Sequence, residues 1–192
     1  MSSTTQPPEI NPQAALIRQA TLDDLDQITE IYNYYIENTA ITFDTKAWLS
    51  EERLPWFNQF ATGSRYQCLV LVLEGRVRGY ACSHQFRPKA AYDRSIETTV
   101  YLDQSVKGHG LGKDLYNKLL EILDQLDIHR IYGIITVPND ASIKLHTDMG
   151  YKQVGLFNEV GFKFNRYWDT VWMERKVGKS LPDNQEKTEN NE

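Results

Sequence analysis

A glycine-rich segment is the part of this sequence whose residue types and spacing point most directly to chemistry. It spans residues 107–112 and reads KGHGLG. Glycine adopts backbone conformations with positive φ and lets a ligand approach the main chain closely. Because helical periodicity follows the segment, its N–H groups would lie at a helix N-terminus, which favours anions. The segment predicts a phosphate-binding loop, and a strand-to-helix turn without a ligand is the alternative.

Two common phosphate-binding motifs do not fit this segment. A dinucleotide-binding fingerprint needs its third glycine at position 113, which is Lys113. A Walker A loop needs glycine at 107 and serine or threonine at 114, and the chain has Lys107 and Asp114 there. A diphosphate at this loop would therefore be held in another way.

Two residues near the loop have side chains suited to acid–base chemistry. Glu97 precedes the loop in a strand-like segment, and His146 follows it in a short helical segment. Each either transfers protons or is an ordinary solvated or packed side chain. Asn139 lies after the intervening strand, and it either contacts a ligand or caps the helix that follows.

The loop between two expected strands gathers cationic and aromatic side chains. Arg87, Lys89 and Arg94 alternate there with Phe86 and Tyr92. Such a set suits a cationic pocket with aromatic walls for an anionic group. A solvated loop is the alternative.

Hydrophobic periodicity predicts the elements that position these residues. Strands are expected at 16–18, 67–73, 76–85, 95–103, 130–137, 151–157 and 168–175. Helices are expected at 21–37, at 47–60 with an interruption near Pro55, at 111–126 and at 139–149. Strands alternate with helices only in part, and hairpins occur at both ends of the order, so the pattern favours a mixed α/β sheet.

The strand expected at 95–103 has two distinct faces, because side chains alternate along a strand. One face carries Ile96, Thr98, Val100 and Leu102, and the other carries Glu97, Thr99 and Tyr101. Glu97 is thus separated from the more apolar face.

Composition and charge exclude several classes of protein. The 192 residues carry 21 basic and 26 acidic side chains, for a net charge of -5. This balance argues against a nucleic-acid partner and against a polybasic membrane anchor. No apolar run approaches the roughly 18 residues that span a bilayer. Residues 1–13 also lack the pattern of a secretory signal, so a cytoplasmic protein is expected.

Both ends are polar, and the sequence predicts a single folded domain at 14–177 between disordered tails at 1–13 and 178–192. The two cysteines, Cys68 and Cys82, flank an expected hairpin turn and could approach each other. In a reducing compartment we expect two packed thiols rather than a disulfide. The histidines are scattered without the spacing of metal ligands, so no metal is expected.

Taken in order, these motifs resemble the GNAT superfamily of N-acetyltransferases, and within it the phosphinothricin N-acetyltransferases. The resemblance spans residues 16–175 and rests on 95–112 (SIETTVYLDQSVKGHGLG), 137–151 (VPNDASIKLHTDMGY) and 167–171 (YWDTV). It implies an α/β fold of one domain, with a mixed, mostly antiparallel twisted sheet of about seven strands flanked by about four helices.

The resemblance also implies acetyl-CoA as cosubstrate and assigns residues to it. The pantetheine arm would meet the main chain of Val100, Tyr101 and Leu102. The pyrophosphate would lie on Lys107, Gly108, His109, Gly110, Leu111, Gly112 and Lys113. Lys107 replaces the glutamine or arginine usual in the family, which keeps a cation but loses a bidentate contact. Asn139 and Ser142 would contact the cofactor further along.

By the same resemblance, Glu97 is the general base and His146 occupies the position where many relatives have a tyrosine acid. The acceptor would be a small glutamate-like amino acid such as phosphinothricin, methionine sulfoximine or methionine sulfone, acetylated in detoxification. Arg87 and Lys89 would hold its carboxylate, and Phe43 and Tyr92 would form apolar walls.

Relatives are commonly dimers, so a homodimer is expected, with the aromatic residues at 162–168 available for the interface. Two other functions stay open from the sequence. One is acetylation of another amine, such as a protein N-terminus or a polyamine. The other is a non-catalytic acyl-CoA-binding module.

Overall fold

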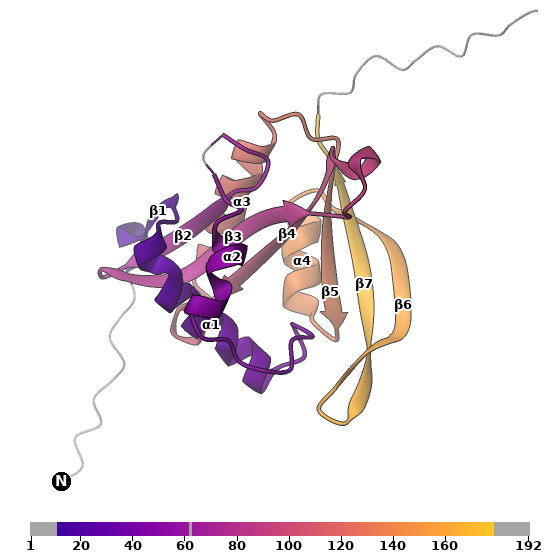
Figure 1. Ribbon diagram of the computed structural model, residues 1–192, viewed down its shortest axis with the longest axis horizontal. Helices are drawn as coiled ribbons and strands as arrows, with labels where there is room; N and C mark the ends of the chain where they lie inside the picture. Colours follow the sequence, from indigo (N-terminus) through magenta and orange to yellow (C-terminus); the bar gives the residue numbers. More distant parts are fainter. Residues whose placement is uncertain (1–10, 62, 179–192) are drawn as a thin grey trace, which may run out of the picture.

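A twisted seven-stranded sheet forms the centre of the computed structural model, which describes residues 11–61 and 63–178 (Figure 1). The strands of this described part are β1 (Leu16–Gln19), β2 (Cys68–Leu73), β3 (Arg76–Gln85), β4 (Ser95–Leu102), β5 (Arg130–Val137), β6 (Lys152–Lys163) and β7 (Arg166–Lys176). Their order in the sheet is β1-β2-β3-β4-β5-β7-β6. All neighbours are antiparallel except β4 and β5. The predicted mixed, mostly antiparallel sheet is confirmed.

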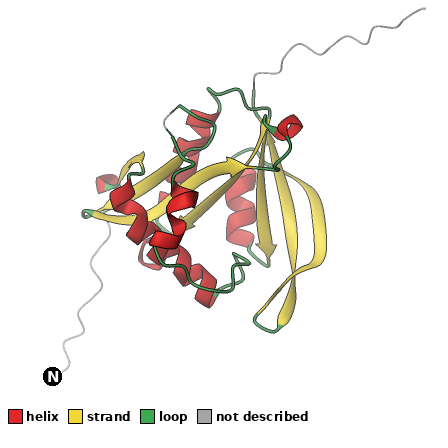
Figure 2. Ribbon diagram, viewed as in Figure 1, coloured by secondary structure: helices red, strands yellow, loops and turns green. Residues whose placement is uncertain are grey.

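Helices pack on both faces of this sheet (Figure 2). They are α1 (Leu25–Asn38), α2 (Leu54–Phe57), α3 (Leu111–Leu123) and α4 (Asp140–Asp148). Alternation along β2 supplies both cores, because Leu69 and Leu71 face the α3 side while Cys68 and Val70 face α1. No helix of the described residues is long and apolar enough to span a bilayer.

The start of the chain is fixed by hydrogen bonds around Asp24. Its carboxylate accepts from the Thr21 N–H at 2.8 Å and receives the Arg18 guanidinium at 2.7 and 2.8 Å. This capping arrangement begins the helix predicted at 21–37, of which the first turn is a 3-10 turn. Of the tails expected at 1–13 and 178–192, residues 1–10 and 179–192 lie outside the described part, and Pro12–Ala14 form one 3-10 turn.

The long helix predicted at 47–60 is wrong. The segment holds only a 3-10 turn, Glu51–Arg53, followed by the four-residue α2. The N–H of Trp48 donates to the Asn33 side chain at 2.9 Å, so it takes part in a tertiary contact instead of a helix. Pro55 has no N–H to continue a helical ladder across the segment.

The last two strands are longer than predicted and form one hairpin. The predicted strands at 151–157 and 168–175 become β6 and β7, joined at Phe164 and Asn165, which both have positive φ. A register shift between Phe157 and Gly161 interrupts the pairing without ending the strand. Glu159 takes positive φ in this bulge, and its N–H donates to Asp169 at 2.7 Å.

The two cysteines lie opposite each other on β2 and β3. Cys68 pairs in register with Cys82, and both are buried free thiols, as expected.

The most consequential feature for the site is that β4 and β5 separate. Their parallel pairing covers three residue pairs and ends with Glu97 opposite Tyr132. β5 pairs with β7 along its other edge from Arg130 to Val137, and no described β5 residue is in register with β4 beyond Glu97. The second half of β4 therefore borders an opening in the sheet.

Candidate active site

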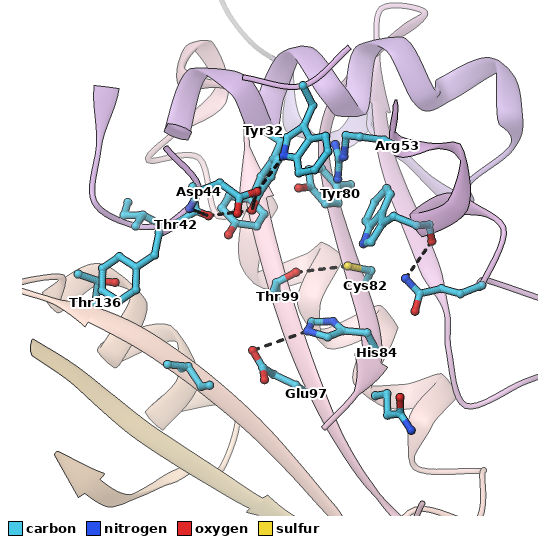
Figure 3. Close-up of a pocket in the computed structure, with 18 of the residues that line it drawn as sticks. Tyr32, Thr42, Asp44, Arg53, Tyr80, Cys82, His84, Glu97, Thr99 and Thr136 are labelled. Atoms are coloured by element: carbon cyan, nitrogen blue, oxygen red, sulfur yellow. Dashed lines mark hydrogen bonds and ion pairs between the residues drawn. The ribbon is translucent and has the colours of Figure 1, made fainter. Parts of the chain in front are cut away.

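A cavity of about 480 Å³ lies on the α1 side of the sheet (Figure 3). Its walls come from α1, the segment at 41–59, β5 and β7. Its floor consists of three cross-strand pairs of β3 and β4, which are Tyr80 with Tyr101, Cys82 with Thr99, and His84 with Glu97. The predicted alternation of β4 places Glu97, Thr99 and Tyr101 together on this floor.

Glu97 is the carboxyl group at one end of the floor. Its side chain is 18% exposed, and its Oε1 lies 3.7 Å from Nε2 of His84. A carboxyl group that faces a cavity and is still reached by solvent can accept a proton from a bound amine.

His84 is a site residue that sequence reasoning missed. Burial lowers the pKa of its imidazole, but the neighbouring Cys82 and Glu97 outweigh that effect and raise it to about 10. The side chain is therefore a cation at neutral pH. Its Nδ1 is buried without a hydrogen-bond partner among the described residues. The alternation of β3 would have revealed His84 only if the register with β4 had been known.

A hydrogen-bonded group forms the opposite wall of the cavity. Asp44 accepts from the Tyr32 hydroxyl at 3.0 Å and from Nε1 of Trp48 at 2.9 Å. The Tyr32 hydroxyl also lies 2.7 Å from Oγ1 of Thr42. Burial raises the pKa of Tyr32 to about 12, so the phenol stays protonated. Both donors reach the same oxygen, Oδ2 of Asp44, so this oxygen ties α1 to the segment at 41–59.

The residues expected around the pantetheine arm border the opening between β4 and β5. A small cavity of about 40 Å³ is lined there by Val100, Tyr101, Asn139, Ser142 and His146, together with residues of β5. The structure thus brings together these five residues. Leu102 lies at the end of β4, and its carbonyl accepts from the Tyr35 hydroxyl at 2.7 Å.

The glycine-rich loop leads directly into α3. Gly108 and Gly110 have φ of 84° and 78°, and Gly110 is the N-cap of the helix. The first helical hydrogen bond at this end comes from the N–H of Lys113 to the Gly110 carbonyl at 2.9 Å. The N–H groups of Leu111 and Gly112 precede it and are available to an anion.

Two contacts connect the loop to its surroundings. Burial lowers the pKa of Lys107, whose Nζ lies 5.1 Å from the centre of the Tyr35 ring. Gly112 faces Leu102, and a Cβ there would lie 2.9 Å from Cδ1 of that leucine. Its missing side chain therefore lets α3 approach β4. His109 is exposed beside these residues. The described residues contain no group of acidic, histidine and cysteine side chains suited to a metal.

His146 is packed rather than free. It is 4% exposed and packs against the rings of Tyr116 and Tyr151, with centroids 5.1 and 5.0 Å away. Nδ1 lies 2.8 Å from the Ser142 carbonyl, and burial lowers the pKa, so the ring is neutral at pH 7. A Cβ at Gly133 would lie 2.6 Å from its Nε2, so the ring needs that glycine.

Asn139 likewise has a structural contact. Its Oδ1 accepts from the Ser142 N–H at 3.2 Å and caps α4. Asn139 therefore caps the helix, as one of the two predictions had it, and it also lines the small cavity.

Of the four residues expected to bind the acceptor, one lines the large cavity and three lie outside it. Phe43 lines the large cavity, where its ring lies against Gly161 of β6. Arg87, Lys89 and Tyr92 are exposed and outside the cavity lining. The Arg87 guanidinium stacks 4.6 Å from the centre of the Phe86 ring. The loop that carries these three residues follows Gln85, which does line the cavity, so it continues from the His84 end of the floor.

Comparisons with known proteins find similarity along most of the chain. A family model described as an acetyltransferase (GNAT) domain matches residues 17–172. A phosphinothricin N-acetyltransferase of Streptomyces coelicolor is 42% identical over 163 residues, which cover 84% of this chain and 95% of the relative. An L-methionine sulfoximine/L-methionine sulfone acetyltransferase of Salmonella typhimurium is 30% identical and covers 84% of this chain and 94% of the relative.

A solved structure agrees with these matches. The crystal structure of a GNAT superfamily phosphinothricin acetyltransferase from Sinorhizobium meliloti, in complex with AcCoA, has a TM-score of 0.81 to this structure. Its sequence is 33% identical, and the match covers 86% of this chain and 89% of that one.

Proposed function

The chain belongs to the GNAT acetyltransferase family, and from this membership we propose that it acetylates the α-amino group of a small glutamate-like amino acid. Phosphinothricin, methionine sulfoximine and methionine sulfone are the proposed acceptors, because relatives are named for them. One observation carries the proposal for this chain. The cavity that presents Glu97 lies at the point where β4 leaves β5, so an amine beside Glu97 can meet a thioester lying along β4.

Acetyl-CoA is the acetyl donor, and the residues of this chain fit it. The half of β4 beyond its pairing with β5 offers main-chain groups to the pantetheine arm, as a neighbouring strand would. The left-handed Gly108 and Gly110 and the first N–H groups of α3 suit the pyrophosphate. Lys107 adds a positive charge on this side.

The reaction follows from these positions. The α-amine of an amino acid is mostly protonated at pH 7 and cannot attack in that form. Glu97 accepts the proton directly or through one water, and the free nitrogen adds to the thioester carbonyl. A main-chain N–H of β4 stabilises the oxyanion that forms. As the tetrahedral intermediate collapses, the C–N bond stays, the C–S bond breaks and CoA leaves as a thiolate. The second proton of the added nitrogen passes to that thiolate or to water, which leaves the neutral amide.

His146 has a lesser part in this scheme. A thiolate is a good leaving group, so protonating it early contributes little. The neutral imidazole packs against Tyr116 of α3 and faces Gly133 of β5, so it fits a role in holding α4 beside the opening between the strands.

The β6–β7 hairpin supports a proposed homodimer. Exposed apolar side chains gather on it, namely Val154, Leu156, Phe157, Val160, Phe162, Phe164 and Tyr167. Exposed apolar surface of this kind marks a protein interface. β6 is also an edge strand, which native proteins cover.

The proposed physiological role is resistance to an amino-acid toxin. Acetylation removes the charge of the α-amine, so the product no longer resembles the parent amino acid. The donor is drawn from the cytoplasmic acetyl-CoA pool, and the cytoplasm is the proposed location.

Thiol release from acetyl-CoA tests the proposal. We expect release that depends on added phosphinothricin, methionine sulfoximine or methionine sulfone, and mass spectrometry should find the N-acetyl product. A polyamine and a peptide with a free N-terminus serve as comparison amines. Release with these amines alone would show a different acceptor class. Tight acetyl-CoA binding without any amine-dependent release would show a binding module.

A further inference from the structure

Arg53 is a buried cation without an acidic partner. The residue is 5% exposed and lines the large cavity from the 3-10 turn before α2. Its Nη1 is buried and has no hydrogen-bond partner among the described residues. A buried guanidinium that lacks a carboxylate is unfavourable unless another group satisfies it. This arrangement points to an anion that arrives from outside the chain.

Two aromatic rings lie against Arg53, and its buried Nη1 has no hydrogen-bond partner among the described residues. Its guanidinium carbon lies 3.9 Å from the centre of the Trp56 ring and 4.7 Å from that of Tyr32. Stacking on aromatic faces fixes the plane of a guanidinium. An aromatic face does not replace a hydrogen-bond acceptor for Nη1, so this nitrogen can still donate to a ligand.

The carboxyl groups that line the cavity already have other partners. Asp44 accepts from Tyr32 and Trp48. Glu52 accepts from the Leu49 N–H at 2.9 Å, and Glu97 faces His84. None of them forms an ion pair with Arg53 within the described chain, so the guanidinium stays available to a ligand.

Arg53 lies at the opposite end of the cavity floor from Glu97. The rings that surround it pack on the Tyr80–Tyr101 pair, with Trp56 6.1 Å from Tyr80 between centroids. Figure 3 shows Arg53 beside Tyr80, while His84 and Glu97 lie further along the strands. The two ends are four residues apart on each strand, or about 13 Å.

This spacing separates the α-carboxylate of an acceptor from an anionic group at the far end of its side chain. The α-carboxylate is bonded to the carbon that carries the amine, so an amine at Glu97 keeps it at the Glu97 end. A group at the far end of the side chain extends along the floor toward Arg53. Building on the proposed function, we propose that Arg53 binds the distal anionic group of the acceptor and makes the cavity selective for amino acids that carry one.

Phosphinothricin and methionine sulfone form a matched pair for the test. Both end in a tetrahedral atom with one methyl group and two oxygens, and only the phosphinate carries a negative charge. We would measure KM and kcat for both with the wild-type enzyme, with Arg53→Gln and with Arg53→Lys. Arg76→Gln is the control, because Arg76 is an exposed arginine remote from the cavity lining. Calorimetry with CoA present would measure binding of each compound independently of turnover.

We expect Arg53→Gln to weaken phosphinothricin binding by about 10- to 100-fold, as loss of a charge-assisted pair does. Methionine sulfone should change by less than about threefold, and kcat should stay similar for both. Arg53→Lys should recover part of the loss, since it keeps the charge without the planar fork. Arg76→Gln should match wild type.

Three outcomes would overturn the assignment. Equal losses for both compounds would mean that Arg53 only supports the cavity wall, and no loss for either would mean that it touches neither. Equal wild-type affinities for the two compounds would also overturn it, even if Arg53→Gln fails to fold. If wild type turns over neither compound, the proposed function fails, while the calorimetric comparison still decides the role of Arg53.

Discussion

His84 and Glu97 lie directly opposite each other on β3 and β4, with Nε2 of the histidine 3.7 Å from Oε1 of the acid. The proposed base therefore has a cation beside it at neutral pH. This cation is in a position to orient the carboxyl group toward the cavity.

Replacing Glu97 with glutamine should lower turnover by about 10²-fold or more near neutral pH, because the amide cannot accept the amine proton. The affinity for acetyl-CoA should stay unchanged, since the proposed donor site lies along β4 and the glycine-rich loop. Thiol-release kinetics and calorimetry with CoA would measure the two effects. Unchanged turnover would remove Glu97 from the role of base.

Replacing His84 with glutamine should change how stability depends on pH. The folded-state pKa is raised from 6.5 to about 10, so the charged pair stabilises the protein fully below pH 6.5. That contribution is lost as the pH rises through 10. The Tm of wild type should therefore fall more than that of the variant between these values. Parallel Tm curves over the same range would contradict the ion pair.

Replacing His146 with alanine should reduce stability more than it reduces chemistry. The buried ring packs against Tyr116 and Tyr151, so its loss should cost about 1–3 kcal/mol of unfolding free energy. Turnover per folded molecule should fall less than in Glu97→Gln. Denaturant unfolding and kinetics on the same preparation would separate the effects. A kinetic loss as large as that of Glu97→Gln would make His146 a central catalytic group.

Replacing Gly110 with alanine should weaken acetyl-CoA binding. The position has positive φ at the N-cap of α3, and an L side chain there strains the backbone by about 1 kcal/mol. Moving the N–H groups proposed to bind the phosphates should raise KM for acetyl-CoA roughly tenfold, equal to about 1.4 kcal/mol. Gly75→Ala is the control, because Gly75 shares the backbone conformation in a hairpin turn remote from the loop. Equal KM values in both variants would argue against phosphate binding by the glycine-rich loop.

Replacing Val160 with aspartate should shift the protein from dimer to monomer. Val160 is exposed on β6, so the charge should leave the fold intact and disfavour a buried interface. Leu22→Asp places the same charge on exposed apolar surface away from the hairpin. Sedimentation velocity would compare the variants. A wild-type protein that sediments as a monomer would exclude the dimer itself.

Local pattern was sufficient for much of the fold. The strands predicted at 76–85 and 130–137 match β3 and β5, because turn residues bound them and their apolar pattern is strong. The alternation of β4 also identified the face that carries Glu97. Strand boundaries and side-chain alternation depend on residues that are close in sequence, so they can be predicted from it.

The site residues that the sequence did not predict are positioned by contacts between distant segments. His84 meets Glu97 only through the register of β3 and β4, and the loop between them does not fix that register from sequence. Arg53 enters the cavity because the segment before α2 folds across α1, where its guanidinium stacks on Tyr32. Sequence reasoning instead expected a long helix there, and nothing in local periodicity separates a cavity wall from a helix face.

At the point where β4 separates from β5, a change that raises the stability of the sheet should lower the activity. A substitution that let β5 stay in register with Val100 or Leu102 would add main-chain hydrogen bonds and make the sheet more resistant to unfolding. The same change would fill the opening in which we propose that the donor binds. Directed evolution for heat resistance should therefore avoid mutations along the facing edges of β4 and β5, or select for turnover at each round.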